Sequence, residues 1–325
     1  MAREICIDLG TSNTVISEKN KGIILCEPTV AAVDNSTGKI LAAGSDAKNL
    51  LGKTPSEISV VCPIKSGVVA DFDVAGAMLR TFLTSVIPKG ALRPKACVCV
   101  PCGITRVEKS TTLEAIERAG AKPAYTVDTP IAAAMGAGLD VSEPSGNMIL
   151  DIGGGKICAS VISFGGIISS AGTTAGGNEA DICIVEYIRR NFGVLIGERT
   201  AEKIKLSIGT ASGNTDEKSI RITGRNEKTG LPEEITVTEG QVYEAILPML
   251  TKMTELVKKV LSNTPAELCE DLRERGIFLC GAGAGLTGLT GFIENHTGFR
   301  ATVTADAHLC AALGAQALCD MGAAQ

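Results

Sequence analysis

The chain has 325 residues, about two domains' worth, with 45% hydrophobic and 21% charged residues, a balance typical of globular proteins. The net charge of −5 argues against nucleic-acid binding through bulk positive charge. No apolar run reaches the roughly 18 residues that a membrane-spanning helix needs.

The first predicted element is a hairpin near the start of the chain. A strand from residue 3 ends at Asp8, a turn containing Gly10 follows, and a second strand begins at Thr14. Residues 147–156 repeat this pattern, with Asp151 at the strand end and glycines in the turn. Two similar halves, each with a carboxylate at a strand end, predict a duplicated fold with a cleft between the copies.

Cysteines are scattered along the whole chain, twelve in all, and most lie inside apolar runs. The favoured interpretation is that they act as small buried hydrophobic residues in a reducing cytosol. The tightest cluster in the sequence is Cys97, Cys99 and Cys102. A zinc site is not expected there, because no histidine is near and no second cysteine pair completes four ligands.

Helix signals follow each hairpin. Residues 105–120 predict a helix with Thr105 as N-cap, Glu108 completing a capping box and Gly120 as C-cap. Residues 179–190 predict a helix with one apolar face, formed by Ile182, Val185 and Ile188.

The second half contains three further elements. Residues 218–238 read as a hairpin around the turn at 225–232. Residues 239–261 predict a long amphipathic helix that Pro248 kinks or interrupts. A third glycine-rich turn, at 281–285, leads from a buried strand toward a helix.

Turns of small residues expose several backbone N–H groups, and glycine lets a phosphate approach closely. Two such turns, one from each half, would hold a polyphosphate from both sides, with Asp8 and Asp151 placed to hold a hydrated Mg²⁺. Plain tight turns are the alternative interpretation, since glycines end strands in many folds. Neither a GxxxxGK[ST] motif nor a strand–GxGxxG–helix motif is present, which argues against the two commonest nucleotide folds.

Residues 197–209 predict a helix that Thr200 can cap and that places Glu202 and Lys205 on one face. From the residues alone, a solvent-exposed ion pair is the competing interpretation.

The order of several segments resembles that in MreB, the bacterial actin homologue of the rod shape-determining family. The resemblance runs from Ile5 to about Leu318 and is carried by DLGTSNT, CEPTVAAV, AAGSDAKNLLGKTP, PIKSGVVADFDV, VPCGITRVE, DIGGG, YIRRNFGVLIGERTAEKIKLSIG and ERGIFLCGAGAGL.

The resemblance implies an α/β, actin-like fold with duplicated ribonuclease-H-like lobes, a nucleotide cleft and two small insertion subdomains. The first lobe would comprise residues 1–138 plus 305–325, with an insertion at about 31–65. The second would comprise 139–304, with an insertion at about 176–250. The C-terminal stretch should return to the first lobe.

The resemblance also implies that ATP or ADP with Mg²⁺ lies in the cleft, the metal being held through water by Asp8 and Asp151. The residues expected to line the nucleotide are Gly10, Thr11, Ser12 and Asn13 in the first phosphate loop, Gly153, Gly154, Gly155 and Lys156 in the second, Glu202, Lys203, Ile204 and Lys205 at the ribose and adenine, and Gly281, Ala282, Gly283 and Ala284 at the base.

Three departures from the family pattern stand out. Thr129 replaces the glutamate that positions the attacking water, and neither it nor the adjacent Asp128 is expected to act as its substitute. Lys156 follows the second glycine loop in place of threonine and could act as a point charge on phosphate or in place of the metal. Ala282 interrupts the third glycine loop and would crowd adenosine if its backbone needed a positive φ. These departures predict a divergent paralogue with weak or absent ATP hydrolysis.

The family polymerises into filaments, usually paired antiparallel, that organise cell-wall synthesis and rod shape. The implied partners are further copies of this chain, other MreB paralogues and wall-synthesis membrane proteins, with no nucleic acid. The alternatives are a non-polymerising regulator of such filaments and a metabolite kinase of the same superfamily, for which no substrate-binding constellation is found.

The implied location is the cytoplasm or the periphery of the membrane's inner face. The N-terminus is too short for an amphipathic membrane helix. Ile87 and Leu92, flanked by cations, are the candidate membrane contacts, and these cations favour anionic lipid only weakly. A plain solvated loop is the alternative interpretation.

Overall fold

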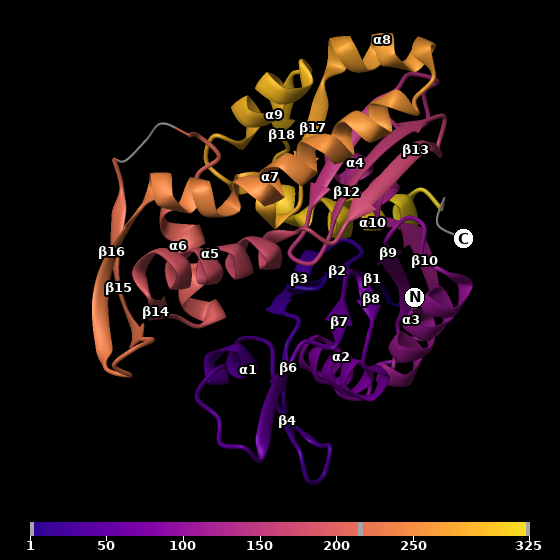
Figure 1. The fold of residues 1–325 in the computed structure, drawn as a ribbon. Helices are drawn as coiled ribbons and strands as arrows, with labels where there is room; N and C mark the ends of the chain where they lie inside the picture. Colours follow the sequence, from indigo (N-terminus) through magenta and orange to yellow (C-terminus); the bar gives the residue numbers. More distant parts are fainter. Residues whose placement is uncertain (1–2, 214–216, 323–325) are drawn as a thin grey trace.

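The computed structural model describes residues 3–213 and 217–322 and consists of two lobes, each built on a five-stranded sheet (Figure 1). The strand orders are β10-β9-β1-β2-β3 and β18-β17-β11-β12-β13. In both sheets the central strand pairs antiparallel with the strand that follows it and parallel with a later strand. The two sheets therefore have the same topology, as the repeated hairpin predicts.

The sheets differ in the lengths of their strands. The first contains β1 (Glu4–Leu9), β2 (Asn13–Glu18), β3 (Gly22–Pro28), β9 (Lys95–Val100) and β10 (Ala124–Asp128). The second contains β11 (Asn147–Ile152), β12 (Ile157–Ser163), β13 (Gly166–Thr173), β17 (Ile277–Cys280) and β18 (Ala301–Val303).

Helices α2 (Phe72–Val86) and α3 (Arg106–Ala119) bury one face of the first sheet over a core that includes Ile5, Ile7 and Met78. The predicted caps of α3 are confirmed. The Thr105 side chain accepts from the Glu108 N–H, the Glu108 carboxylate accepts from the Thr105 N–H, and Gly120 ends the helix.

The second lobe carries most of the remaining helices, and its core lies between its sheet and α7. Its elements outside the sheet are α5 (Gly177–Phe192), β14 (Val194–Leu195), α6 (Glu198–Ile208), β15 (Ser219–Asn226), β16 (Pro232–Thr238), α7 (Glu239–Ser262), α8 (Ala266–Arg275), η1 (Ala282–Gly285), α9 (Leu289–Thr297) and η2 (Ala307–Leu309). The hairpin β15–β16 is confirmed.

Two local predictions in this lobe were wrong, those for Ile182 and Thr200. Pro248 was expected to kink or interrupt α7, and the helix continues through it without interruption. On α5 the buried residues include Ala180, Ile184 and Ile188, whereas Ile182 is 44% exposed. Helix α6 begins after Gly197, so Thr200 lies inside the helix and does not cap it.

A small insertion extends from the first lobe (Figure 1). It contains a three-stranded sheet and a short helix, namely β4 (Ala31–Asp34), β5 (Ile40–Ala43), α1 (Ser45–Leu50) and β6 (Ile58–Val61), and the short hairpin β7 (Ile64–Lys65) and β8 (Val68–Val69) follows it. The expected insertion at about 31–65 covers all but the last of these strands. The lobe boundaries themselves stay a prediction.

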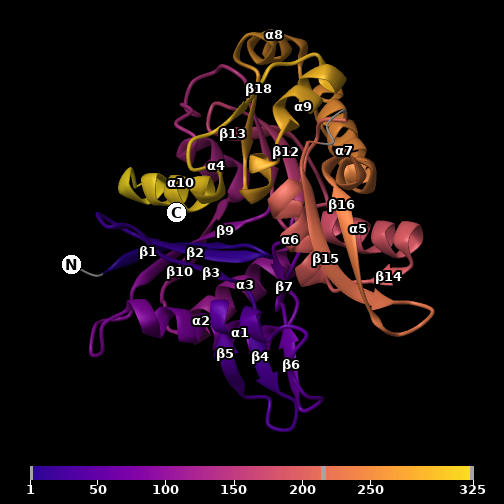
Figure 2. The ribbon, with the colours of Figure 1, turned by 90° about the vertical axis from the view of Figure 1, so that its left-hand side faces the viewer.

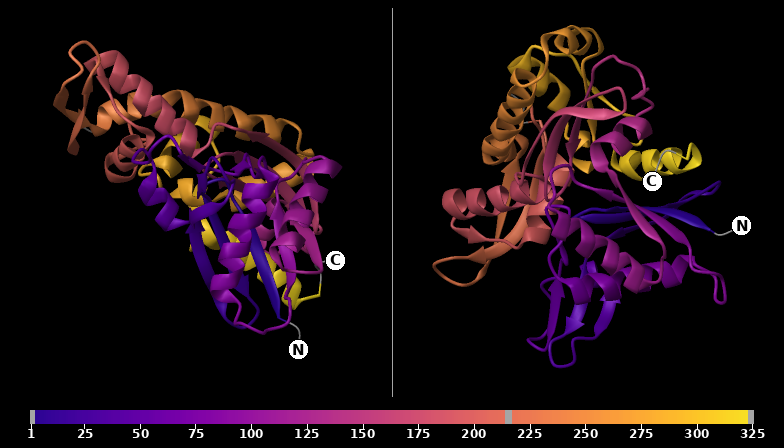
Figure 3. Two further views of the ribbon diagram at one scale, coloured as in Figure 1. Left: turned by 90° about the horizontal axis from the view of Figure 1, so that it is seen from below. Right: turned by 90° about the vertical axis from the view of Figure 1, so that its right-hand side faces the viewer.

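Helices α4 (Thr129–Gly136) and α10 (Cys310–Asp320) lie side by side between the lobes (Figure 2). The C-terminal helix α10 packs on β1 and β9 of the first sheet, and α4 packs on β11 and β12 of the second. The described chain therefore returns to the first lobe at its end, and the start of β1 and the end of α10 lie on the same side of the molecule (Figure 3).

Two glycines let these helices approach closely. A Cβ on Gly136 would lie 1.9 Å from the Cys310 carbonyl oxygen, and a Cβ on Gly314 would lie 1.7 Å from the Ala132 carbonyl oxygen. Neither distance is possible for a real side chain, so the crossing depends on both glycines.

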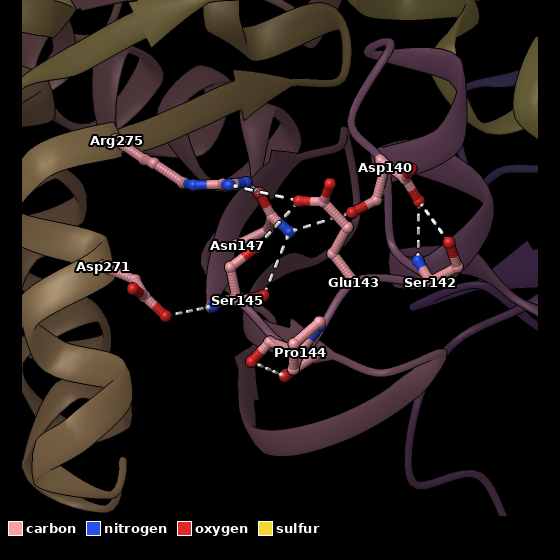
Figure 4. A network of polar contacts seen from close by, with 10 residues as sticks. Asp140, Ser142, Glu143, Pro144, Ser145, Asn147, Asp271 and Arg275 are labelled. Atoms are coloured by element: carbon pink, nitrogen blue, oxygen red, sulfur yellow. Dashed lines mark hydrogen bonds and ion pairs between the residues drawn. The ribbon is translucent and has the colours of Figure 1, made fainter.

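The segment between α4 and β11 is fixed by a polar network (Figure 4). Arg275 of α8 donates to Asn147 and Glu143, and Asp271 accepts from the Gly146 N–H. This network anchors the start of β11, the strand that carries Asp151 near its end.

Among the residues that the structure describes, no helix is both long enough and apolar enough to cross a bilayer.

We predict that Gly314→Ala lowers the free energy of unfolding by roughly 3 kcal/mol or more, because the added methyl group meets the backbone of α4. Chemical denaturation measures the effect. Gly76→Ala in α2 is the matched control, since its Cβ would meet nothing within 4 Å, and it should be neutral or stabilise by up to about 1 kcal/mol. Equal effects of both variants would contradict the proposed close crossing.

Candidate functional site

Two adjoining cavities lie where the lobes meet. The smaller has a volume of about 130 Å³ and the larger about 500 Å³. Both are lined by residues of the two hairpin turns, and the residues they share are Ser12, Asn13, Gly153, Gly154 and Ala282.

The smaller cavity is lined by the ends of β1 and β11 and by both hairpin turns. The predicted residues that line it are Asp8, Gly10, Thr11, Ser12, Asn13, Thr129, Asp151, Gly153, Gly154, Gly155, Lys156, Gly281 and Ala282. Both carboxylates therefore face one space.

The two turns touch each other across this space. A Cβ on Gly154 would lie 1.8 Å from Ser12 Oγ, and one on Gly155 would lie 2.5 Å from Thr11 Oγ1. Ser12 Oγ also donates to Asn178 Oδ1 over 3.1 Å. The glycines of the second turn are therefore needed for the contact between lobes.

The second turn is also tied to the start of α5. The N–H groups of Gly177 and Asn178 donate to the carbonyl oxygens of Gly153 and Gly154, at 3.0 and 2.8 Å. Glycine carbonyls of the turn therefore point toward α5.

The two carboxylates are unusually basic. Burial, with the charge of Asp151 as a smaller contribution, raises the pKa of Asp8 to about 7. Burial raises the pKa of Asp151 to about 6, although a hydrogen bond with Cys280 and the charge of Lys156 act in the opposite direction. Both upward shifts mean that burial costs the ionised carboxylates more than their protein partners compensate.

Lys156 lines the same cavity, and its aliphatic chain lies over β13, where a Cβ on Gly172 would be 2.7 Å from Lys156 Cε. Its charge acts on Asp151. The structure thus places one cation beside the second carboxylate, on the wall of the smaller cavity.

Thr129 is the first residue of α4 and lines the smaller cavity, whereas Asp128 is exposed and lines neither cavity. The cavity wall at this point therefore presents a hydroxyl group and no carboxylate. His308, which the sequence analysis did not single out, lines the same cavity.

The apolar lining of the larger cavity includes Ile246, Met249, Met253 and Leu286. Its polar lining includes Glu202 and Lys205 of α6, as well as Lys218 and Glu239. A largely apolar cavity with a few polar groups, adjoining a smaller cavity lined by two glycine turns, is typical of a small-molecule binding site.

Glu202 and Lys205 do not pair with each other. Lys205 Nζ donates to Asp181 and to the Gly177 carbonyl oxygen, at 2.8 Å each. Glu202 accepts from Lys48 Nζ at 2.8 Å. Lys48 belongs to α1 of the first lobe, so this ion pair bridges the two lobes at the rim of the larger cavity.

Three of the expected site residues line neither cavity. Lys203 is exposed, Ile204 lies in the core of the second lobe, and Ala284 is buried. Gly283 lines the larger cavity. Ala282 is not among the residues with positive φ, so its methyl group sits on an ordinary backbone and the expected conflict does not arise.

Other lining residues were missed because they come from distant segments. Ser66 and Gly67 reach the smaller cavity from the turn between β7 and β8, and Cys99 reaches it from β9. No local pattern marks them.

In the candidate membrane loop, Ile87 packs partly against the first-lobe core, whereas Leu92 is 78% exposed. Only Leu92 of this pair is free to contact another surface.

Comparison with known proteins identifies the family. The model for MreB/Mbl proteins matches residues 2–324. The chain belongs to the MreB/Mbl family. It is 41% identical over 320 residues to the cell shape-determining protein Mbl of Bacillus subtilis, covering 98% of this chain and 96% of Mbl. It is 41% identical over 319 residues to the cell shape-determining protein MreB of Escherichia coli, covering 96% and 92% of the two chains.

Solved structures confirm the actin-like fold. The crystal structure of MreB5 of Spiroplasma citri bound to AMPPNP has a TM-score of 0.94 at 30% identity, with 99% of this chain and 97% of that chain covered. The same protein bound to ADP gives a TM-score of 0.95, covering 99% and 98%. A chain of the MamK double helical filament has a TM-score of 0.83 at 19% identity, covering 98% and 99%, and shows the fold alone.

We predict that Asp8→Asn stabilises the ligand-free protein at pH 8 by on the order of 2 kcal/mol. The folded pKa of Asp8 is raised to about 7, so the folded state resists ionisation and wild-type stability falls as the pH rises from about 4 to 7. Denaturation without nucleotide or metal at pH 8 and pH 5 should show a smaller gain at pH 5.

Asp128→Asn removes an exposed carboxyl group at another strand end and serves as control. It should change stability by less than about 0.5 kcal/mol. Destabilisation by Asp8→Asn at pH 8 would show that the Asp8 charge is compensated.

Proposed function

We propose that this protein binds an adenine nucleotide in the cleft between its lobes and assembles into filaments that organise cell-wall synthesis and rod shape. One observation carries the proposal: two glycine turns, one from each copy of the duplicated sheet, meet at a cavity that two carboxylates share. The related proteins named as cell shape-determining, and the related structure with bound AMPPNP, support it.

The carboxylates fit a divalent cation. Asp8 and Asp151 offer the hard oxygen ligands that Mg²⁺ prefers, and their raised pKa values reflect charge that a cation would offset. When bound, Mg²⁺ would neutralise phosphate charge. Lys156 supplies a positive charge on the same side, so it would hold phosphate whether or not the metal is present.

The larger cavity would then take the base and ribose. Lys205 is held by Asp181 and Gly177, which fixes its position on the wall of that cavity. Ala282 lines both cavities, where the base-side and phosphate-side linings meet. The apolar side chains of α7 that line the larger cavity would receive the flat face of a base.

Hydrolysis is proposed to be slow. The cavity wall has Thr129 where the family's water-positioning glutamate is expected, and the neighbouring Asp128 lines neither cavity. A hydroxyl group neither accepts a proton from water at neutral pH nor reaches as far as glutamate.

We also propose that the protein contacts other copies of itself, other MreB paralogues and wall-synthesis membrane proteins, and that it lies in the cytoplasm or against the membrane's inner face. Leu92 would provide at most a weak membrane contact, because it is the single exposed apolar side chain of the proposed pair.

We predict that ATP binds the wild-type protein with and without Mg²⁺, and that Lys205→Gln weakens binding about tenfold, equivalent to about 1.4 kcal/mol. Isothermal titration measures both. Lys203→Gln is the matched control, since Lys203 is exposed on the same helix and lines neither cavity. Loss of binding without Mg²⁺ would remove Lys156 as a cation substitute.

The same samples examined by electron microscopy test assembly. We expect the wild type and Lys203→Gln to form filaments with ATP. Lys205→Gln should form them only at a higher ATP concentration. An absence of filaments, combined with shortening of filaments of an ordinary MreB on mixing, would assign the regulatory alternative. Transfer of phosphate to a small metabolite would assign the kinase alternative.

We predict that Thr129→Glu raises the rate of phosphate release from ATP by about 100-fold, because a positioned general base contributes 10²–10⁴-fold. Thr129→Gln is the control, because glutamine is as long as glutamate but has no carboxylate to act as a general base. Wild-type phosphate release as fast as that of ordinary family members would contradict the role assigned to Thr129.

A further inference from the structure

Three cysteines from three separate elements meet behind the cleft. Cys6 of β1 and Cys97 of β9 are register partners on adjacent parallel strands, so their side chains point to the same face of the sheet. Tyr125 of β10 continues this row as the register partner of Cys97. The tightest cluster is therefore different from the one that the sequence suggests, since Cys102 lines the smaller cavity instead.

The third cysteine comes from the C-terminal helix. Cys319 of α10 covers the row, with its sulfur 3.4 Å from Cys6 Sγ. The three sulfurs all lie within 4.8 Å of one another. Sulfurs bonded to one metal ion at about 2.3 Å each lie up to about 4 Å apart, so small rotations would bring all three onto one ion.

The cluster is buried among mostly apolar side chains. Cys6 and Cys97 are 2% and 0% exposed, and Cys319 is 9% exposed. Ala132, Ala315 and Leu318 pack around them. Buried cysteines can act simply as small hydrophobic residues. Here, however, three sulfurs from positions up to 313 residues apart converge, and together they can bind one metal ion.

We propose that Cys6, Cys97 and Cys319 form a three-sulfur binding site for copper(I). Soft thiolate sulfur selects soft ions, among which copper(I) and zinc(II) are the common candidates. Structural zinc is almost always four-coordinate, and this cluster contains three metal-binding side chains and no histidine. The nearest further group is the Tyr125 hydroxyl, 3.2 Å from Cys319 Sγ, and it donates its proton to Glu4 Oε1. Copper(I) needs no fourth ligand.

Cys319 is the most exposed of the three cysteines, and a bound ion would have a defined effect. Cys319 lies one residue before the end of α10, at the least buried corner of the cluster. Binding would displace the thiol protons as the sulfurs coordinate the ion. The ion would then fasten α10 to β1 and β9.

This fastening point lies next to the cleft. Asp8 follows Cys6 by two residues on β1, and Cys99 follows Cys97 by two residues on β9, so both lie on the same face, about 7 Å further along. Both line the smaller cavity. A copper(I) ion would therefore restrain α10 one side-chain row behind the two hairpin turns at the smaller cavity.

The test uses the full chain, reduced and free of oxygen, in competition with bicinchoninate, a coloured copper(I) chelator. We expect one copper(I) per protein to be withdrawn from the chelator. Cys319→Ser should weaken this binding by more than about 100-fold, since loss of an outer-shell partner alone costs 10–100-fold. Cys26→Ser, at an exposed position on β3, is the control and should bind like the wild type.

A second measurement guards against misfolding. Thermal unfolding followed by circular dichroism should show that one equivalent of copper(I) raises the Tm of the wild type and of Cys26→Ser, but not of Cys319→Ser. Cys319→Ala replaces the serine variant if that variant is unfolded without metal.

Two outcomes would overturn the proposal. The first is copper(I) retained equally by the wild type and the Cys319 variants. The second is one zinc(II) bound in preference to copper(I) and lost in Tyr125→Phe, which would assign a four-coordinate zinc site.

Discussion

The cleft depends on an unfavourable arrangement, in which two carboxylates face one space with little compensation. Asp8 and Asp151 occupy equivalent places on β1 and β11, and each sits in a strand that is paired on both sides. The paired strands fix the backbone from which each carboxylate extends. The folded protein thus retains a place where added positive charge is favoured, and the glycine turns lie beside it.

The lobes are joined by an exchange of helices. Helix α4 follows the first sheet in the chain and packs on both sheets, whereas α10 follows the second sheet and packs on the first. Their glycine crossing brings the two backbones into contact, so the two lobes share this helix pair. Thr129 lies at the start of α4, and Cys6 and Cys97 lie beneath α10, so both features belong to the region where these two helices join the lobes.

Features with a local cause were predictable from sequence. The hairpins with Asp8 and Asp151 follow from strand patterns and glycine turns, and the Thr105 capping box acts over three residues. The apolar face of α7 follows from helical spacing, and the helix continues through Pro248, which was expected to kink or interrupt it. The family resemblance supplied the rest of the fold.

Features that join distant segments were not predictable in this way. Lys48 and Glu202 lie 154 residues apart, and Cys6 and Cys319 lie 313 residues apart, so no local pattern reveals either contact. The resemblance assigned the continuous stretch 202–205 to the ligand, but a helix turns its side chains to different sides, which places Ile204 in the core. Ile182 was misassigned because it shares helical spacing with buried residues while facing solvent.

The Lys48–Glu202 ion pair is a weak contact between the two lobes at the rim of the larger cavity. Its two side chains are 41% and 32% exposed, and pairs this exposed contribute only about 0–1 kcal/mol. Dissolved salt weakens such an attraction further. The two lobes are therefore joined at this rim by a contact whose strength depends on the ionic strength of the solution.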